Sequence, residues 1–250
     1  GGDGLHTLNI STAVAFVTAG AGVTVAKHGN KAVSSSSGSS DVLSELGLKI
    51  DATTAGILES SGSFTYFHAP LYYPALKIVA PARAKVGRSI FNLLGPLLNP
   101  VGAERQLIGV FSANLMRTYA EVLRELGTKK AWIVNGMDGM DEISISGVTQ
   151  VCELEAGAID IFTITPEDAG LKRYPIESIK GGDAKHNAAA LLRLLEGEKG
   201  AYREIVLLNT AAALIVAGLT NSLEEGVQIA AHSLDFGQAK EVLNKLKAST

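Results

Sequence analysis

The chain contains a single cysteine, Cys152, among its 250 residues, so no internal disulfide can form. A lone thiol is typical of a reducing compartment, and we expect a cytoplasmic protein. Long apolar runs are also absent, because the nearest candidate, residues 13–26, is interrupted by Gly20 and Gly22. A membrane-spanning helix needs about 20 apolar residues, so we expect no membrane partner. The first residues show no basic stretch followed by an apolar one, and no signal peptide is expected.

An excess of positive charge is absent as well. The formal net charge is −3, whereas proteins that bind duplex nucleic acid usually carry a basic surface. We therefore expect no nucleic-acid partner. The chain is 46% hydrophobic and 19% charged, which is enough apolar material for one sizeable core. This core can belong to one large domain or to a large domain with a small one.

Helix-like and strand-like segments alternate along the first half of the chain. Apolar spacing and capping residues predict helices at residues 11–19, 41–46, 74–85 and 114–126, and short strands at residues 23–26, 64–67, 106–111 and 131–134. Strands separated by helices indicate parallel β-α-β units. The fold class we predict is α/β, with a mixed, mainly parallel sheet flanked by helices.

The second half has a different pattern. Apolar residues alternate between 143 and 164 and are separated by glycines, which predicts antiparallel hairpins at the edge of the sheet. From Ala184 onward the sequence is mostly helical. The sheet is therefore expected to end before this helical part begins.

Several glycine-rich and hydroxyl-rich segments near the start are typical of phosphate binding. They are Gly1-Gly2-Asp3-Gly4, Asn9-Ile10-Ser11-Thr12, Lys27-His28-Gly29-Asn30 and the serines between Ser34 and Ser40. Glycine lets backbone N–H groups approach an anion, and a hydroxyl at a helix start adds a donor where the helix dipole favours negative charge. The alternatives are a simple tight turn at residues 1–4 and a flexible linker in the serine run.

Two adjacent carboxylates, Asp141 and Glu142, follow the strand predicted at residues 131–134. Magnesium commonly binds through one or two carboxylates together with substrate phosphates, so this pair predicts a Mg²⁺ site at the mouth of the sheet. The alternative is a solvated pair of loop acids. Lys27 lies at the end of an apolar segment, where an unpaired charge is costly unless an anion joins it. The alternative for His28 is a structural histidine. The remaining histidines lack metal-ligand spacing, so zinc is not indicated.

The order of these motifs resembles the anthranilate phosphoribosyltransferase family, which catalyses the second step of tryptophan biosynthesis. The resemblance runs from Gly1 to about Lys245 and includes three further motifs: Phe91-Asn92-Leu93-Leu94-Gly95-Pro96-Leu97-Leu98-Asn99-Pro100, Gly181-Gly182-Asp183-Ala184 and Leu207-Leu208-Asn209. It implies that residues 1–250 are mainly the α/β catalytic domain. A small all-helical domain would lie upstream, its N-terminal part missing from this chain, with helices from about residues 74–100 contributing to it.

The resemblance also implies a role for individual residues. The donor, 5-phosphoribosyl 1-pyrophosphate (PRPP), would be held by Gly1, Gly2, Asp3, Asn9, Ser11, Thr12, Lys27, Ser34, Ser35 and Ser39. Ser11, Asp141 and Glu142 would reach its magnesium, which is expected as two ions. The pocket for the acceptor, anthranilate, would be lined by His28, Asn30, Tyr73, Arg83 and Gly95. No residue is expected to act as an acid or base, because stabilising the leaving pyrophosphate and aligning the amine suffice.

The resemblance implies a homodimer that forms through the helical domain. Without the upstream helices, we expect apolar helices late in the chain, such as residues 206–219, to expose surface.

The sequence departs from the family pattern at a few positions. Lys31 stands where arginine is usual, Ser36 replaces a basic residue, and Tyr73 replaces a histidine. The segment between Gly87 and Ile90 is one residue short. Two other functions remain as alternatives, namely a pyrimidine nucleoside phosphorylase and a non-catalytic paralogue that binds nucleic acid.

Overall fold

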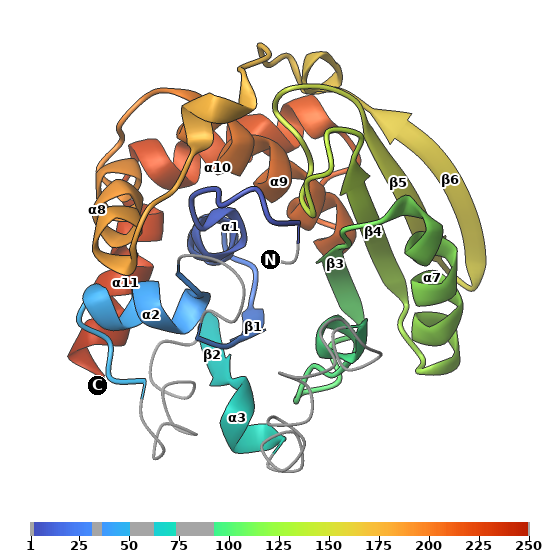
Figure 1. The fold of residues 1–250 in the computed structure, drawn as a ribbon, viewed down its shortest axis with the longest axis horizontal. Helices are drawn as coiled ribbons and strands as arrows, with labels where there is room; N and C mark the ends of the chain where they lie inside the picture. The colour runs from blue at the N-terminus through green and yellow to red at the C-terminus, as the bar shows by residue number, and fades with distance from the viewer. Residues whose placement is uncertain (1–2, 32–36, 51–62, 74–92, 250) are drawn as a thin grey trace.

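The computed structural model describes residues 3–31, 37–50, 63–73 and 93–249. A helical half and a sheet-containing half lie side by side, and the start of the chain lies between them (Figure 1). The helices are α1 (Ile10–Gly20), α2 (Ser39–Glu45), α3 (Ala69–Tyr72), α7 (Met116–Glu125), α8 (Ala184–Leu195), α9 (Ala201–Ala217), α10 (Leu223–Asp235) and α11 (Gln238–Ala248). The strands are β1 (Val25–Gly29), β2 (Phe64–His68), β3 (Arg105–Gly109), β4 (Lys130–Gly136), β5 (Thr149–Glu155) and β6 (Ala158–Ile164).

The strands form two sheets in the described residues. Strands β1 and β2 make a parallel pair, and the larger sheet has the order β3-β4-β5-β6. Strands β3 and β4 are parallel and joined through α7, whereas β4, β5 and β6 pair antiparallel. The α/β class with a mixed sheet flanked by helices is confirmed. The described pairs divide evenly between parallel and antiparallel.

The hairpin predicted at residues 143–164 begins later than expected. Strand β5 starts at Thr149, and Ile143 and Ile145 lie instead in the loop after β4, fully buried. Their apolar spacing therefore reflects burial in a loop. The loop can be buried because a side chain from α9, Asn209, satisfies the backbone of Ile143.

Helix α1 lies at the centre of the helical half (Figure 1). It packs against α9, α10, α11 and β1, and its residues from Thr12 to Ala19 are buried. The helix begins at Ile10, one residue before the predicted range of 11–19, and Asn9 precedes it. Ser11 is exposed in the first turn, whereas Thr12 is 1% exposed and directed into the core.

Strand β1 occupies residues further along the chain than the predicted strand at 23–26. Pairing with β2 extends from Val25 to Gly29, so Lys27 and His28 lie opposite Tyr66 and Phe67 inside the strand. Helix α2 also starts earlier than predicted, at Ser39, where the Asp41 carboxylate accepts the Gly38 N–H at 2.9 Å. The last serines of the run are therefore helical.

Helix α9 does not expose the apolar surface expected for residues 206–219. Its side chains are largely buried, because α1 and α10 cover it on one side and β3 and β4 contact it on the other. Leu219, two residues beyond the end of the helix, is 50% exposed. The helix predicted at residues 74–85 lies outside the described residues. Among the described helices, none is long and apolar enough to cross a membrane.

Cys152 lies in the middle of β5, between Ile133 of β4 and Ile161 of β6. Its side chain is fully buried, and this burial raises the pKa of the thiol. The predicted absence of a disulfide follows from the single cysteine in the sequence.

Candidate functional site

The first turn of α1 and the middle of β1 meet through Lys27. Its Nζ donates a hydrogen bond to Ser11 Oγ at 3.1 Å. Burial lowers the pKa of Lys27, and the nearby Glu142 carboxylate opposes that effect. The structure therefore brings together two residues predicted from separate motifs, a cation and a hydroxyl at a helix start, which together suit a phosphate.

The Glu142 carboxylate lies near this lysine, and Asp141 and Asp3 lie near Glu142. Asp141 and Glu142 belong to the loop after β4, and the backbone N–H of Asp141 is 3.5 Å from Asp3 Oδ2. Burial, and then the charge of Asp141, raises the pKa of Asp3. The same two causes raise the pKa of Glu142 to about 7. Negative charge is therefore concentrated beyond what Lys27 alone offsets.

This concentration of oxygen donors fits a hard cation. The described residues contain no ready-made cage of three or more metal-binding side chains. Magnesium does not require one, because it usually retains water and takes substrate phosphates as ligands beside one or two carboxylates. Asp141 and Glu142 are two such carboxylates.

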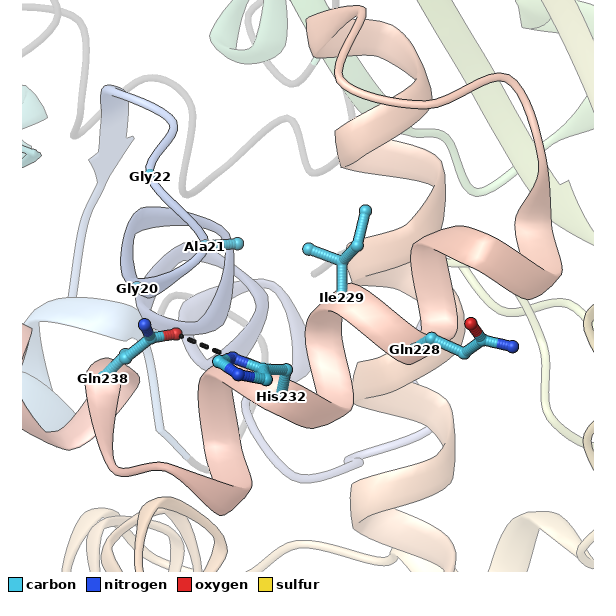
Figure 2. Close-up of a pocket in the computed structure, with 7 residues that line it drawn as sticks. All are labelled: Gly20, Ala21, Gly22, Gln228, Ile229, His232 and Gln238. Atoms are coloured by element: carbon cyan, nitrogen blue, oxygen red, sulfur yellow. Dashed lines mark hydrogen bonds between the residues drawn. The ribbon is translucent and has the colours of Figure 1, made fainter.

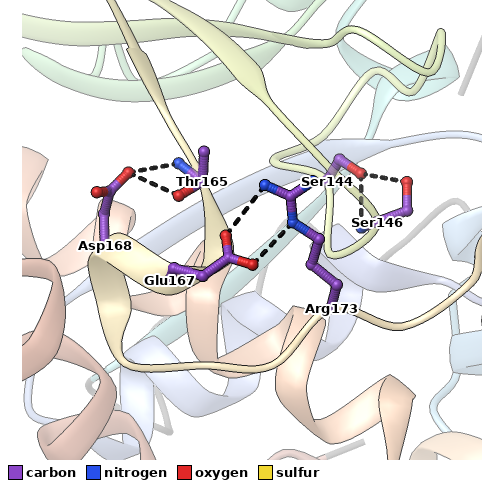
Figure 3. Close-up of polar contacts among 6 residues, drawn as sticks. All are labelled: Ser144, Ser146, Thr165, Glu167, Asp168 and Arg173. Carbon is purple, nitrogen blue, oxygen red and sulfur yellow. Dashed lines mark hydrogen bonds and ion pairs between the residues drawn. The ribbon is translucent and has the colours of Figure 1, made fainter.

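The loop that carries these carboxylates is fixed at several points. Asp138 accepts hydrogen bonds from the hydroxyls of Ser144 and Ser146 and from Met140 N–H. Figure 3 shows the two serines joined to each other, with the segment after β6 beside them, where Arg173 pairs with Glu167. Tyr174 N–H in turn donates to the carbonyl of Ile145 at 3.1 Å. The loop is therefore tied to itself and to a neighbouring segment.

The end of β3 contacts the same loop. A Cβ on Gly109 would lie 1.5 Å from the Asp141 carbonyl oxygen, so only glycine allows this approach. The carboxylate pair is thus held close to the sheet.

An asparagine on α8 joins two of the predicted donor segments. Asn187 Nδ2 donates to Asn9 Oδ1 and to Ser37 Oγ, each at 2.8 Å, and its Oδ1 accepts Gly182 N–H. Tyr202 of α9 donates its hydroxyl to the Asn9 carbonyl at 3.1 Å. The Oδ1 atom and the backbone carbonyl of Asn9 are therefore occupied by protein contacts.

The described serines pack into the fold. Ser39 and Ser40 share the Tyr66 hydroxyl, each at 2.8 Å, and a Cβ on Gly29 would lie 2.1 Å from Ser39 Oγ. In residues 37–40 the linker alternative is therefore wrong. Five predicted positions lie outside the described residues, namely Gly1, Gly2, Ser34, Ser35 and Arg83, as does the departure at Ser36.

Of the predicted acceptor residues, His28, Tyr73 and Gly95 lie close to one another beside β1. His28 Nε2 donates to the Gly95 carbonyl at 2.7 Å, and Asn99 Nδ2 lies 3.5 Å from Nδ1. Burial lowers the pKa of His28, which favours the neutral ring. The Tyr73 hydroxyl donates to the Leu98 carbonyl, and Asn30 is exposed. His28, Tyr73 and Gly95 are thus joined through the 95–99 segment.

A separate hollow of about 500 Å³ lies at the opposite end of α1. It is lined by Gly20, Ala21, Gly22, Gln228, Ile229, His232 and Gln238 (Figure 2). An 11-residue helix is about 16 Å long, so this hollow is distant from Ser11 and Lys27. It contains none of the predicted site residues.

Comparison with known proteins agrees with this geometry. The sequence model of the glycosyl transferase family, a/b domain, matches residues 1–240. The anthranilate phosphoribosyltransferase of Parvibaculum lavamentivorans is 54% identical over 254 aligned residues, covering all of this chain and 74% of the relative. The chain belongs to the anthranilate phosphoribosyltransferase family.

Solved structures of anthranilate phosphoribosyltransferases share the fold. The enzyme from Thermus thermophilus superimposes with a TM-score of 0.93 at 42% identity, over 99% of this chain and 75% of that one. The Saccharomyces cerevisiae enzyme in complex with PRPP and Mg gives a TM-score of 0.90 at 30% identity, over the whole of this chain and 71% of that one.

Several residues around the site were not predicted from the sequence. They are Asn99, Asn187, Tyr202 and Asn209, to which the sequence assigned no role. The one available signal was a buried-looking amide within an apolar helix, as at Asn209 in Val-Leu-Leu-Asn-Thr-Ala, because such a group requires partners when it is buried.

Proposed function

We propose that the protein transfers the phosphoribosyl group of PRPP to the amine of anthranilate and releases pyrophosphate, as a pentosyltransferase of tryptophan biosynthesis. The observation that carries this proposal is the meeting of Lys27 and Ser11 with Asp3, Asp141 and Glu142. A cation and a hydroxyl suit phosphate, and the adjacent carboxylates suit its counter-ion.

The reaction replaces one bond at the ribose anomeric carbon. The bond from that carbon to the pyrophosphate oxygen breaks, a bond to the anthranilate nitrogen forms, and the amine loses one proton. Bound magnesium would neutralise charge on the departing pyrophosphate. Lys27 and the N–H groups at the start of α1 would stabilise the donor phosphates, and the loop carboxylates would hold the cation.

The acceptor would bind beside β1. His28 is held by the Gly95 carbonyl and is favoured as the neutral ring, so it would line the pocket without acting as a base. Arg83 is proposed as the carboxylate partner from the resemblance alone, because a guanidinium grips a carboxylate at two points.

Loss of anthranilate fluorescence in the presence of PRPP and Mg²⁺ tests the activity. We expect turnover by the unaltered protein, and a higher Mg²⁺ requirement in Asp141→Asn and Glu142→Gln with little change in melting temperature. Turnover of thymidine and phosphate in place of anthranilate would support the phosphorylase alternative. Duplex retention without turnover would support the nucleic-acid alternative. The family assignment favours neither.

Three finer features belong to the same proposal. We propose that two Mg²⁺ ions accompany PRPP, that the protein is a homodimer joined through a helical domain, and that it acts in the cytoplasm. Titration calorimetry with PRPP gives the ion number, light scattering gives the mass in solution, and cell fractionation gives the location. A single ion, a monomer or a membrane fraction would contradict the respective feature.

A further inference from the structure

The side chain of Asn209 is hydrogen-bonded to the loop that carries Asp141 and Glu142. Its side chain is fully buried in the middle of α9. Its Oδ1 accepts the Ile143 N–H at 2.9 Å, and its Nδ2 donates to the Ile143 carbonyl at 2.8 Å. The amide therefore brackets both backbone groups of the residue that follows Glu142.

The chemistry of this bracket is specific to an amide. Nδ2 donates a second hydrogen bond, to the Ile205 carbonyl of the preceding helical turn at 2.9 Å. All three hydrogen bonds need one acceptor and two donors in a single planar group. Aspartate keeps only the acceptor, and a hydrocarbon side chain keeps neither. Buried backbone groups left without partners are costly, so the loop would move to satisfy Ile143 elsewhere.

The loop has an electrostatic reason to move. The backbone N–H of Asp141 lies 3.5 Å from Asp3 Oδ2, and Glu142 follows Asp141 directly in the chain, so negative charges on these three side chains repel one another. Gly109 contacts Asp141 from the sheet side, and Asn209 holds Ile143 from the helix side. These two contacts keep the carboxylates together before a cation neutralises them.

We propose that Asn209 is a positioning residue that preorganises the Asp141 and Glu142 carboxylates for magnesium and the donor. The inference rests on the proposed function, because that function gives the two carboxylates their role. Without these hydrogen bonds, the binding of the cation must also provide the free energy that brings the carboxylates together. The affinity for the cation is therefore lower.

Two variants and two controls test the proposal. Asn209→Ala removes all three hydrogen bonds, and Asn209→Asp keeps the one from Ile143 N–H. Leu214→Ala lies further along the same helix and is equally buried, so it reproduces a loss of core stability while leaving the Asn209 amide in place. Thr210→Val replaces a buried hydroxyl that has no hydrogen-bond partner among the described residues.

The first measurement uses the metal-free protein. Hydrogen exchange of the amides in residues 138–146 should accelerate in Asn209→Ala, relative to both the unaltered protein and Leu214→Ala at equal fractional unfolding. The second measurement is the Mg²⁺ concentration that gives half the maximal rate at saturating PRPP. It should rise by about 5- to 30-fold in Asn209→Ala and by less in Asn209→Asp, with no change in either control.

The outcomes are separable. Folded Asn209 variants with unaltered loop exchange and unaltered Mg²⁺ dependence would overturn the inference. Failure of both variants to fold under conditions where Leu214→Ala folds would also overturn it, since Asn209 would then be a folding determinant. If the unaltered protein does not convert anthranilate, the proposed function fails. In that case, hydrogen exchange still decides whether Asn209 controls the loop. A comparison of how far Mg²⁺ raises the melting temperature of the unaltered protein and of the Asn209 variants then replaces the rate measurement.

Discussion

At the scale of single residues, two opposing effects act on the pKa of Lys27. Burial favours its neutral amine, whereas Glu142 favours its charged ammonium. An ammonium has three N–H donors, and among the described residues Ser11 Oγ accepts one of them. The same side chain therefore links the first turn of α1 to the loop that carries Glu142.

Lys27→Met should weaken PRPP binding far more than anthranilate binding. A charge-assisted hydrogen bond to phosphate contributes about 1.5–3 kcal/mol and has no counterpart at the aromatic ring. Titration calorimetry with each substrate measures the difference, with Lys129→Met as a control because Lys129 pairs with Glu104 on the surface. Donor affinity within about a factor of two of the unaltered protein would make Lys27 structural.

Glu142 should make the metal-free protein less stable as the pH rises from 4.5 to 7. Its pKa is raised from 4.5 to about 7 in the folded state, so folding favours the protonated form and stability is lost as that proton leaves. Urea unfolding at several pH values should show this fall, and a smaller one in Glu142→Gln. Identical pH profiles for the two proteins would contradict the assigned pKa.

At the scale of secondary-structure elements, the end of β3 and the loop that carries Asp141 and Glu142 approach each other closely through their backbones. The contact requires glycine at position 109, because a Cβ would overlap the Asp141 carbonyl. Displacement of that carbonyl moves the carboxylates on either side of it. A strand end therefore sets the geometry of a loop that lies more than thirty residues later in the chain.

Gly109→Ala should raise the Mg²⁺ requirement and lower the melting temperature. The added methyl forces a backbone shift, and overpacking of this kind typically costs about 1–3 kcal/mol. Gly147→Ala is the matched control. Its Cβ would meet no atom within 4 Å, and Gly147 lies in the connection between β4 and β5 that also contains Asp141. Equal behaviour of the two variants in a Mg²⁺ titration would show that the contact has no functional effect.

The elements could be predicted where local chemistry determines them. The apolar run of α1 and the alternating strand β6 follow from spacing, and the α7 pattern places a helix between two parallel strands. The bounds of β1 could not be predicted, because its pairing with β2 spans residues about forty positions apart. Asn187 and Asn209 were missed for the same reason, since their partners lie in distant segments.

The site depends on the whole molecule through such long-range contacts. Asn187 joins Asn9 and Ser37, which lie 178 and 150 positions away in the sequence. Asn209 reaches 66 positions back to Ile143. The helices from Ala184 onward thus hold loops from earlier in the chain.

Asn187→Leu should lower both the stability and the affinity for PRPP. It leaves the polar side chains of Asn9 and Ser37 without their shared partner, at a cost of about 1–3 kcal/mol in unfolding free energy. Ser233→Ala is the matched control, since Ser233 also joins a late helix to α1, through the Val17 carbonyl, away from the donor residues. Urea unfolding and PRPP calorimetry on both variants decide whether donor affinity falls only in Asn187→Leu.

The burial of Cys152 makes this chain suited to site-specific labelling. Its thiol is enclosed in the larger sheet, with a raised pKa, so maleimide reagents should leave it unmodified in the folded state. A cysteine introduced at Met137, which is 68% exposed beside the carboxylate loop, would then be the single reactive thiol. A spin label or fluorophore there would report the arrival of magnesium in real time, without any cysteine having to be removed first.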